Sequence, residues 1–208
     1  MEKTEVTIEA VREVGPDTVA VDLETPEGFS ARPGQFVKLE TEVEGEHVSR
    51  FYTLSSPDVE ERFEITIAVD PEGTLGPWIA NEDREGETVT VEGPYGSAYY
   101  EDESELLILA GGPGVGPAVG IGERAIEDGG DVTVVYCDDE PVHEERLEAL
   151  REAGATVVVT DELADHVGSY YDGQRTFVYG FGEFVTEALD ALEEAGGDPD
   201  DAKVENFG

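Results

Sequence analysis

The chain has 208 residues, enough for one large domain or two small domains with cores of their own. Asp and Glu number 51 against 12 Lys and Arg, so the formal net charge is −39 at pH 7 and a basic patch for duplex DNA or RNA is excluded. The single cysteine, Cys137, excludes an intrachain disulfide and an iron–sulfur cluster held by cysteines.

So large an acidic excess makes disorder the first alternative. However, 38% of the residues are hydrophobic and fall in strand-like runs, which predicts a folded protein. Acidic residues along the whole chain are typical of a surface adapted to very high salt, where screening removes self-repulsion. We therefore expect a halophilic, cytoplasmic protein, with an acidic protein from ordinary salt as the alternative. The uncharged stretch Leu106–Gly122 is too rich in Gly and Pro to span a membrane.

Residues 4–92 contain short β segments at close spacing, separated by turn formers such as Gly15-Pro16-Asp17. Alternating polarity predicts about six strands and no long helix. The expected strands are Val6–Val14, Thr18–Leu23, Gln35–Thr41, His47–Thr53, Phe63–Val69 and Glu87–Glu92. This pattern indicates a small antiparallel β-barrel.

One stretch of this half combines a cation, an aromatic ring and hydroxyl groups. In Arg50-Phe51-Tyr52-Thr53-Leu54-Ser55-Ser56, strand alternation puts Arg50, Tyr52 and Leu54 on one face. Such groups can hold a phosphate, stack on a planar ring and hydrogen-bond a ring heteroatom. The alternative is an ordinary strand with a surface arginine and a core tyrosine. A second stretch, Gly73–Ala80, runs from glycine into Pro77 and indicates another anion-binding turn before a short helix.

From Glu105 onward the pattern changes to alternating strands and helices. The expected strands are Leu106–Ala110, Val132–Cys137, Thr156–Thr160, Thr176–Tyr179 and Ala202–Phe207. The expected helices are Pro117–Ile126, Val142–Ala153 and Glu183–Ala195, and the segment up to Tyr171 has no assignment. Right-handed crossovers between such units build a doubly wound parallel five-stranded sheet with helices on both faces. We therefore expect two domains, at residues 1–100 and 101–208.

The stretch Leu106–Gly120 runs from an apolar strand through a glycine- and proline-rich loop into a helix. Backbone N–H groups and the positive end of the helix dipole favour anions such as phosphate at such a loop. Ligands of parallel sheets bind beyond the carboxyl ends of the strands, where the strand order reverses. A connector without a ligand is the alternative. The fingerprint G-x-G-x-x-G is not matched, because Gly120-x-Gly122-x-x-Ala125 falls inside the predicted helix.

Asp138 follows the second strand of this half. In nucleotide-binding sheets this position meets the adenosine ribose, where a carboxylate favours a 2′-hydroxyl and repels a 2′-phosphate. Asp138 therefore favours NAD over NADP, although a chain this acidic can carry an aspartate there by chance. His47, His143 and His166 lie outside these motifs, and we interpret each as a surface or structural residue.

With both halves in view, the whole chain resembles the ferredoxin–NAD(P)H reductase superfamily, with the acidic composition of a haloarchaeal type. Arg50-Phe51-Tyr52-Thr53 looks like the family's R-x-Y-[ST]. The resemblance implies Arg50 on the flavin nucleotide's phosphate, Tyr52 on the isoalloxazine and Thr53 near the flavin N5, with Leu54, Ile67 and Val69 also at the flavin. Gly93-Pro94-Tyr95-Gly96 is similar to the G-P-x-G that closes the family's Greek-key barrel.

Two further loops match the family's phosphate-binding motifs. Gly73–Ile79 occupies the place of the G-x-x-S-x-x-L pyrophosphate loop, with Pro77 in place of the serine. The resemblance implies that this loop holds FAD through Gly73, Thr74, Leu75, Gly76 and Pro77. Gly111–Pro117 looks like G-G-x-G-[IV]-x-P. It implies that the pyridine nucleotide's pyrophosphate is held by Gly111, Gly112, Pro113, Gly114, Val115 and Pro117.

The C-terminal part matches less closely. The family's C-G-P loop falls on Tyr179-Gly180-Phe181, where Tyr179 is far larger than the cysteine that lies beside the nicotinamide in relatives. Glu205-Asn206-Phe207 is similar to the E-x-[aromatic] ending of some members. That ending implies that Phe207 covers the flavin until the nicotinamide displaces it, with an ordinary apolar last strand as the alternative.

The resemblance implies an FAD-dependent oxidoreductase with an FAD-binding barrel domain and an NAD(P)-binding α/β domain. It would pass electrons between NAD(P)H, with NADH favoured, and a protein acceptor such as ferredoxin. The implied catalytic residues are Thr53, Tyr179, Glu205 and Phe207, and no metal is required. Arg32, Lys38 and Arg50 would guide docking of an acidic acceptor. The alternatives are a flavin-binding electron-transfer subunit or regulatory module without NAD(P)H turnover of its own, and a nucleotide-binding module without flavin.

Overall fold

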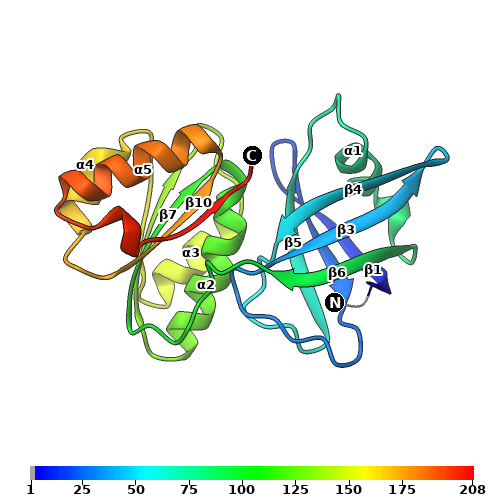
Figure 1. Cartoon of the computed structure of the whole chain (residues 1–208), viewed down its shortest axis with the longest axis horizontal. Coiled ribbons are helices and arrows are strands. Elements are labelled where there is room, and N and C mark those ends of the chain that lie inside the picture. Colours follow the sequence, from blue (N-terminus) through cyan, green and yellow to red (C-terminus); the bar gives the residue numbers. More distant parts are fainter. Residues whose placement is uncertain (1–2) are drawn as a thin grey trace.

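The computed structural model describes residues 3–208, apart from the side chain of Glu82. It contains two sheets, each with a hydrophobic core, which lie side by side in Figure 1. The first two residues of the expected first domain lie outside the described part. The antiparallel barrel followed by a parallel α/β sheet confirms the expected fold class.

The first sheet is antiparallel and has the order β4-β3-β6-β1-β2-β5. Its strands are β1 (Lys3–Gly15), β2 (Thr18–Glu24), β3 (Phe36–Val43), β4 (Glu46–Thr53), β5 (Arg62–Ala68) and β6 (Thr88–Tyr95). A bridge between Leu54 and Ile65, and a hydrogen bond of 2.8 Å from the N–H of Ser55 to the Glu64 carbonyl, join β4 to β5 and close the barrel. Between β5 and β6 lie the short helix α1 (Leu75–Ile79) and the 3-10 turn Glu82–Arg84.

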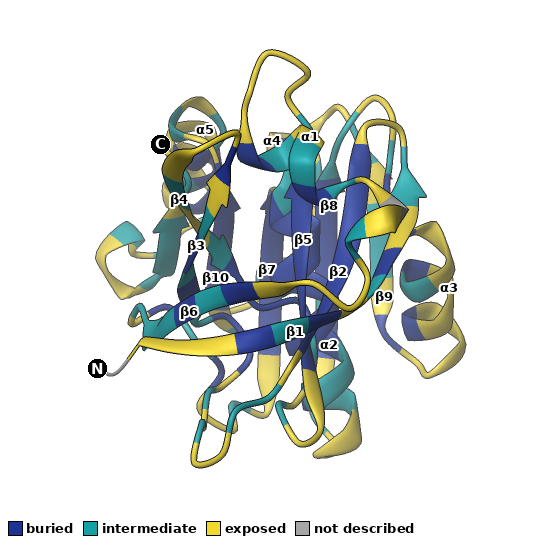
Figure 2. Ribbon diagram, turned by 90° about the vertical axis from the view of Figure 1, so that its right-hand side faces the viewer, coloured by how far each residue is buried: buried dark blue, intermediate teal, exposed yellow. Residues whose placement is uncertain are grey.

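The second sheet is parallel and has the order β11-β10-β7-β8-β9. Its strands are β7 (Glu105–Gly111), β8 (Asp131–Cys137), β9 (Thr156–Thr160), β10 (Arg175–Gly180) and β11 (Lys203–Asn206). The central strands β7 and β8 are mainly buried (Figure 2), which explains their nearly continuous apolar sequences.

Helices cover both faces of the parallel sheet. The core on one face includes residues of α2 (Val115–Glu127) and α3 (Glu144–Glu152), and the core on the other includes residues of α4 (Leu163–Tyr170) and α5 (Gly182–Glu194). Helix α4 occupies the segment for which the sequence pattern indicates no element. Two 3-10 turns, Gly112–Gly114 and Pro199–Asp201, complete this half. Among residues 3–208, none of the helices has both the length and the apolar composition needed to cross a membrane.

The strand order reverses between β7 and β10, because the chain runs from β7 to β8 on one side and returns to β10 on the other. The loops that follow these two strands, at Gly112 and Phe181, therefore lie at the topological switch point. This is the place where ligands of doubly wound sheets bind.

Candidate cofactor and active site

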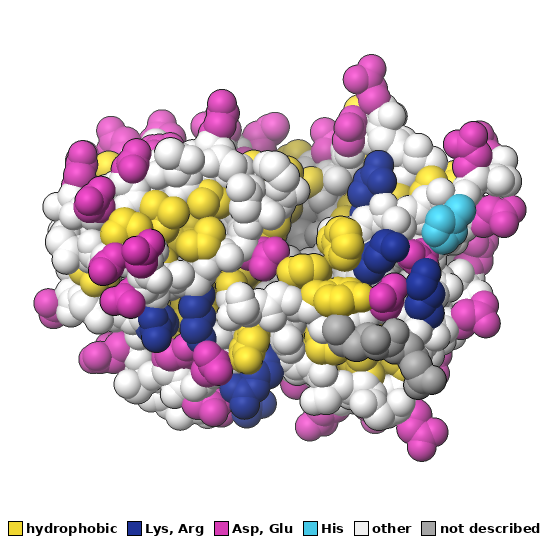
Figure 3. Space-filling view, viewed as in Figure 1, with side chains coloured by type: hydrophobic (Ala, Val, Ile, Leu, Met, Phe, Trp, Pro, Cys, Tyr) yellow, Lys and Arg dark blue, Asp and Glu magenta, His cyan; other side chains and the backbone are white. Residues whose placement is uncertain are grey.

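A cavity of about 930 Å³ is lined by residues of both halves of the chain. Figure 3 shows the hollow between the two lobes, bordered by hydrophobic and basic side chains. The lining residues expected from sequence are Arg50, Tyr52, Thr53, Gly73, Thr74, Leu75, Gly76, Pro113, Pro117, Phe181, Glu205 and Phe207. Motifs that are up to 157 positions apart in the chain thus meet at one site.

On the barrel side of the cavity, strand β4 supplies a cation, Arg50, and an aromatic ring, Tyr52. The guanidinium of Arg50 is exposed and donates a hydrogen bond of 2.8 Å to the Ser49 carbonyl. No carboxylate among the described residues lies within 4.0 Å of it, so this guanidinium is available to an anion. Tyr52 is half-buried and packs on the barrel core, and this burial, only partly offset by Arg50, raises its pKa to about 12. Thr53 beside it is buried.

Three residues expected at the flavin are not among those that line the cavity. Leu54 and Ile67 are almost fully buried in the barrel core, and Val69 packs against that core. The neighbouring residues of β5, Thr66 and Ala68, line the cavity instead. The reason is the two-residue period of a strand: Ile65 and Ile67 fill the barrel, so the intervening side chains face outward. Pro77, in α1, is exposed and is not among the lining residues.

The loop after β7 approaches the cavity closely. Pro113 and Pro117 line it, while Gly111, Gly114 and Val115 are buried behind it. A Cβ at Gly114 would collide with the Tyr179 carbonyl. Position 114 therefore needs glycine, and the φ of +55° at Gly112 favours glycine there as well. The 13-residue helix α2 starts at Val115, which directs its N-terminal dipole to this edge of the sheet.

Tyr179 does not lie at the cavity. Its side chain is fully buried, and its hydroxyl donates a hydrogen bond of 2.5 Å to the Ala98 carbonyl in the segment that joins the two sheets. Burial raises its pKa well above the ordinary value, with a further contribution from Glu205. Tyr179 is therefore not among the residues that line the cavity, and its contact with a nicotinamide stays a prediction. The sequence shows that the residue lies near the end of a strand but not which side of the sheet it faces.

The aromatic residue that does line the cavity here is Phe181. Its side chain is 51% exposed and meets the ring of Phe207 edge-on, with the ring centroids 6.0 Å apart. The N–H of Phe207 donates a hydrogen bond of 2.9 Å to the carbonyl of Gly180, which is itself buried against Phe184. Glu205 is half-buried, and burial raises its pKa. These residues together form the wall of the cavity on the side of the parallel sheet.

Asp138 stands apart from this cavity. Its carboxylate accepts hydrogen bonds of 3.0 Å from the Tyr136 hydroxyl and from the N–H of Glu140. It therefore shapes the loop between β8 and α3.

An aromatic cluster that is not among the expected cofactor-binding residues borders the cavity. Phe36, Phe51 and Tyr95 have ring centroids 5.6 to 6.3 Å apart, and Phe51 is 61% exposed. Cross-strand register brings them together, because Phe36 pairs with Tyr95 and Lys38 with Phe51. The available sequence signal was the position of Phe51 and Tyr95 within recognised motifs. The cavity is also lined by Lys38, Asp70, Glu92, Asn206 and Gly208.

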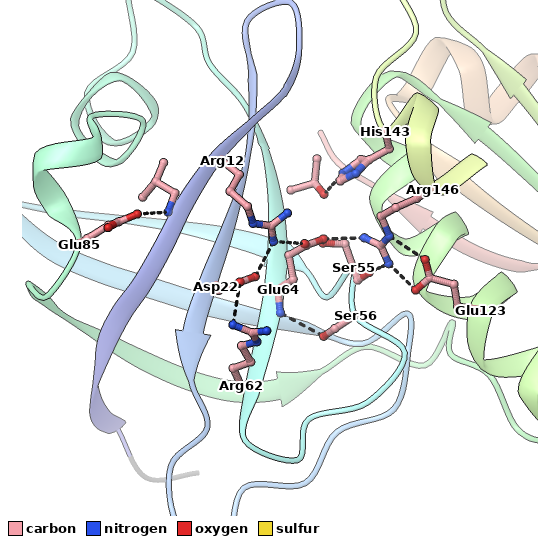
Figure 4. A network of polar contacts seen from close by, with 12 residues as sticks. Arg12, Asp22, Ser55, Ser56, Arg62, Glu64, Glu85, Glu123, His143 and Arg146 are labelled. Carbon is pink, nitrogen blue, oxygen red and sulfur yellow. Dashed lines mark hydrogen bonds and ion pairs between the residues drawn. The ribbon is translucent and has the colours of Figure 1, made fainter. Parts of the chain in front are cut away.

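A polar network fixes the two halves to each other behind the cavity (Figure 4). Arg146 of α3 makes two hydrogen bonds to Glu123 of α2, at 2.6 and 2.7 Å, and one of 2.6 Å to Glu64 of β5. It also donates to the Ser55 carbonyl at 2.7 Å. Helix α2 packs so closely that a Cβ at Gly120 would lie 2.8 Å from that carbonyl oxygen. The relative placement of the two lobes is therefore held by both charge and close packing.

The residues of the cavity fit a flavin dinucleotide. The volume lies within the range of small-molecule and cofactor sites. The Arg50 guanidinium, which pairs with no carboxylate among the described residues, suits a phosphate, and the Tyr52 ring offers a flat apolar face. Gly73 and Gly76 leave backbone exposed along the wall between them. Within residues 3–208, no group of three or more His, Cys, Asp or Glu side chains could hold a metal ion.

Residues 5–100 match the family model of the oxidoreductase FAD-binding domain. The chain is 37% identical over 111 residues to a glycine betaine monooxygenase reductase subunit of Pseudomonas aeruginosa, covering 52% of this chain and 30% of the relative. It is 30% identical over 194 residues to the ferredoxin reductase component of a 3-ketosteroid-9-alpha-monooxygenase of Mycolicibacterium smegmatis, covering 84% of this chain and 55% of the relative. The chain thus spans about half or less of the length of these relatives.

The fold also matches a solved structure, the FAD/NAD-binding domain of a nitric oxide dioxygenase from Vibrio cholerae. The TM-score is 0.84 with 20% identity, and the match covers 98% of each chain. That likeness concerns the fold, whereas the matches in sequence concern the family. Residues 5–100 are thus an FAD-binding domain of the oxidoreductase type, and the chain as a whole is similar to ferredoxin reductase components.

Proposed function

We propose that this chain accepts a hydride from NADH on bound FAD and passes the two electrons one at a time to a protein acceptor. FAD supplies the change from two-electron to one-electron transfer, and the protein supplies binding, orientation and exclusion of water. The observation that carries the proposal is the single cavity lined by the barrel motif, the loop after β7 and the C-terminal aromatic residue. A site of this composition can hold two planar cofactors face to face.

In this proposal the barrel binds FAD. Arg50 pairs with a phosphate, Tyr52 packs on the isoalloxazine and Thr53 hydrogen-bonds near N5. The segment 73–77 follows the pyrophosphate with its backbone. The exposed guanidinium of Arg50 and the place of Gly73 and Gly76 along the cavity support these roles.

The parallel sheet binds the nicotinamide nucleotide. The loop 111–117 and the N-terminus of α2 hold its pyrophosphate, as an anion at a helix N-terminus would be held. We propose that Phe207, with Phe181 against its edge, covers the flavin face before nicotinamide enters, and that Glu205 polarises this end of the cavity. NADH is favoured over NADPH because Asp138 lies in the loop after β8 and would repel a 2′-phosphate.

The acceptor is proposed to be a ferredoxin or a partner oxidoreductase subunit. Relatives that are named as reductase subunits or components of monooxygenases support this class. Lys38 and Arg50 at the cavity, with Arg32, would guide an acidic partner. The chain has 51 acidic and 12 basic residues, and this acidic excess supports a halophilic, cytoplasmic protein. A rise in melting temperature with molar salt would agree with that source, and a fall would contradict it.

A second candidate is a flavin-binding subunit or regulatory module without NAD(P)H turnover of its own. It is favoured by one observation, that Tyr179, which stands at the place of the family's C-G-P cysteine, is fully buried and is not among the residues that line the cavity. Such a chain would need a partner to complete its reaction.

One experiment separates these functions. The protein is purified in high salt, and its visible spectrum is recorded without oxygen before and after addition of NADH. A yellow protein that bleaches supports the reductase, and one that stays oxidised supports the module. A colourless protein that cannot be loaded with FAD refutes both. Arg50→Ala should lose FAD, whereas Arg62→Ala, whose guanidinium is 3.6 Å from Asp22, serves as the control and should retain it.

A further inference from the structure

His143 is a buried residue at the interface of the two lobes, at the start of α3. Its ring crosses to the barrel, where Nε2 lies 2.8 Å from Oγ1 of Thr66. Thr66 is one of the two residues of β5 that line the cavity and that the motifs did not indicate. The imidazole therefore contacts a residue that also lines the cofactor cavity.

The backbone around His143 is also fixed to the barrel. Its N–H donates a hydrogen bond of 2.8 Å to the Val14 carbonyl, and φ is +55°, a conformation that few residues other than glycine adopt. Val142 packs so tightly that a Cβ on Gly15 would collide with it. The loop from Asp138 to His143, which follows β8, is thus held against the end of the barrel.

The Thr66 hydroxyl has little freedom. A Cβ at Gly116, in the first turn of α2, would lie 2.7 Å from Oγ1, so the hydroxyl is confined between this turn and the imidazole. Burial, reinforced by Arg146, lowers the pKa of His143 to about 4. The ring is therefore neutral at pH 7 and has one donor and one acceptor nitrogen, either of which can pair with a hydroxyl.

We infer that His143 is a positioning residue for FAD: from across the interface of the two lobes it holds the Thr66 hydroxyl and so fixes the side chain that Thr66 contributes to the wall of the cofactor cavity. The inference rests on the proposed function and adds to it a residue of the nucleotide-binding half that acts on the flavin. A side chain of the cavity wall that is already fixed loses less entropy when a ligand packs on it, so the contact between His143 and Thr66 should tighten FAD binding.

The test is a double-mutant cycle on FAD binding to the apoprotein, measured by the change in flavin fluorescence. Thr66→Val and His143→Gly should each weaken binding about three- to tenfold, the value of one hydrogen bond. Because His143 acts through Thr66, the double variant should bind no more weakly than Thr66→Val alone. His143→Gln, whose amide can both donate and accept, should recover part of the affinity. His47→Gln, at a histidine with a 68% exposed side chain, is the control.

The outcomes separate this inference from the proposed function. If the wild-type chain does not bind FAD, the proposed function fails. If it binds FAD and the two single effects add in the double variant, or Thr66→Val binds as tightly as the wild type, the inference is wrong. The melting temperature of each apoprotein reports folding. Should His143→Gly not fold, the cycle uses His143→Asn, because asparagine tolerates a positive φ but is shorter than histidine.

Discussion

Replacing Arg146 by methionine should lower the free energy of unfolding, because it removes polar contacts between the two lobes. The substitution keeps an apolar side chain of similar length. The substitution removes the guanidinium that joins Glu123, Glu64 and the Ser55 carbonyl. Breaking a buried ion pair by removing one partner costs about 3–5 kcal/mol. We expect about 3 kcal/mol, the lower end of that range, because Glu64 keeps Arg12 at 2.7 Å and the Glu123 side chain is 25% exposed.

Urea unfolding of the apoprotein at neutral pH measures this loss. The matched control is Arg151→Met on the same helix, because Arg151 pairs with Glu148, whose side chain is 61% exposed, and should contribute at most about 1 kcal/mol. Molar salt should remove the small effect of the control and leave most of the effect at Arg146, since buried pairs are screened less. Equal losses for the two variants would refute the interface role of Arg146.

The same variant has a defined effect on acid stability. Burial raises the pKa of Glu64, but Arg146, together with Arg12 and Ser55, outweighs it and lowers the pKa below its ordinary value of 4.5. A carboxylate with a lowered folded pKa contributes stability above the unfolded pKa and loses it as the pH falls through the folded pKa. In Arg146→Met, the folded pKa of Glu64 rises, so acid unfolding should begin at a higher pH than in the wild type.

Three further predictions concern single side chains. Gly116→Ala should lose about 1–3 kcal/mol of unfolding free energy through overpacking, because the new Cβ would lie 2.7 Å from the Thr66 hydroxyl. The control Gly168→Ala has open space around the new Cβ and should be neutral or stabilising. Tyr179→Phe should lose about 1 kcal/mol of unfolding free energy with an unchanged rate of flavin reduction by NADH; a changed rate would restore a role for this residue at the nicotinamide. The pKa of His143 is about 4 in the folded protein and 6.5 in the unfolded chain, so the free energy of unfolding of the wild type should fall by about 3 kcal/mol as the pH drops from 6.5 to 4. Urea titrations at several pH values should show this fall in the wild type and not in His143→Gln.

The arrangement of elements could be read from local patterns. The strands of both halves and the helices α2, α3 and α5 appear within a few residues of their expected bounds, because each has a clear period of apolar residues. Helix α4 (Leu163–Tyr170) is the exception, since it is short and has only Leu163 and Val167 as buried residues. A single turn of apolar spacing is too weak a signal to separate a helix from a loop.

The candidate site was readable where a motif and its surroundings agree. Arg50, Tyr52 and the glycines at 73 and 76 line the cavity as the motifs indicated. Ile67 and Tyr179 do not, because a motif gives a position along the chain but not the face of the strand. Phe36 and Tyr95 reach the cavity through cross-strand register, which no local pattern reports.

The sequence by itself determined that a barrel precedes a parallel sheet and that one glycine-rich loop stands at the carboxyl end of its first strand. These features follow from turn residues and short periods, which act within a few positions of the chain. Only the tertiary structure decided what lies beside that loop. Glu64, Ser55 and Thr66 of the barrel meet Arg146 of α3 and His143 just before it across 77 to 91 positions, so their contacts depend on how the two lobes pack. Through that packing, the barrel motif and the loop after β7 line one cavity.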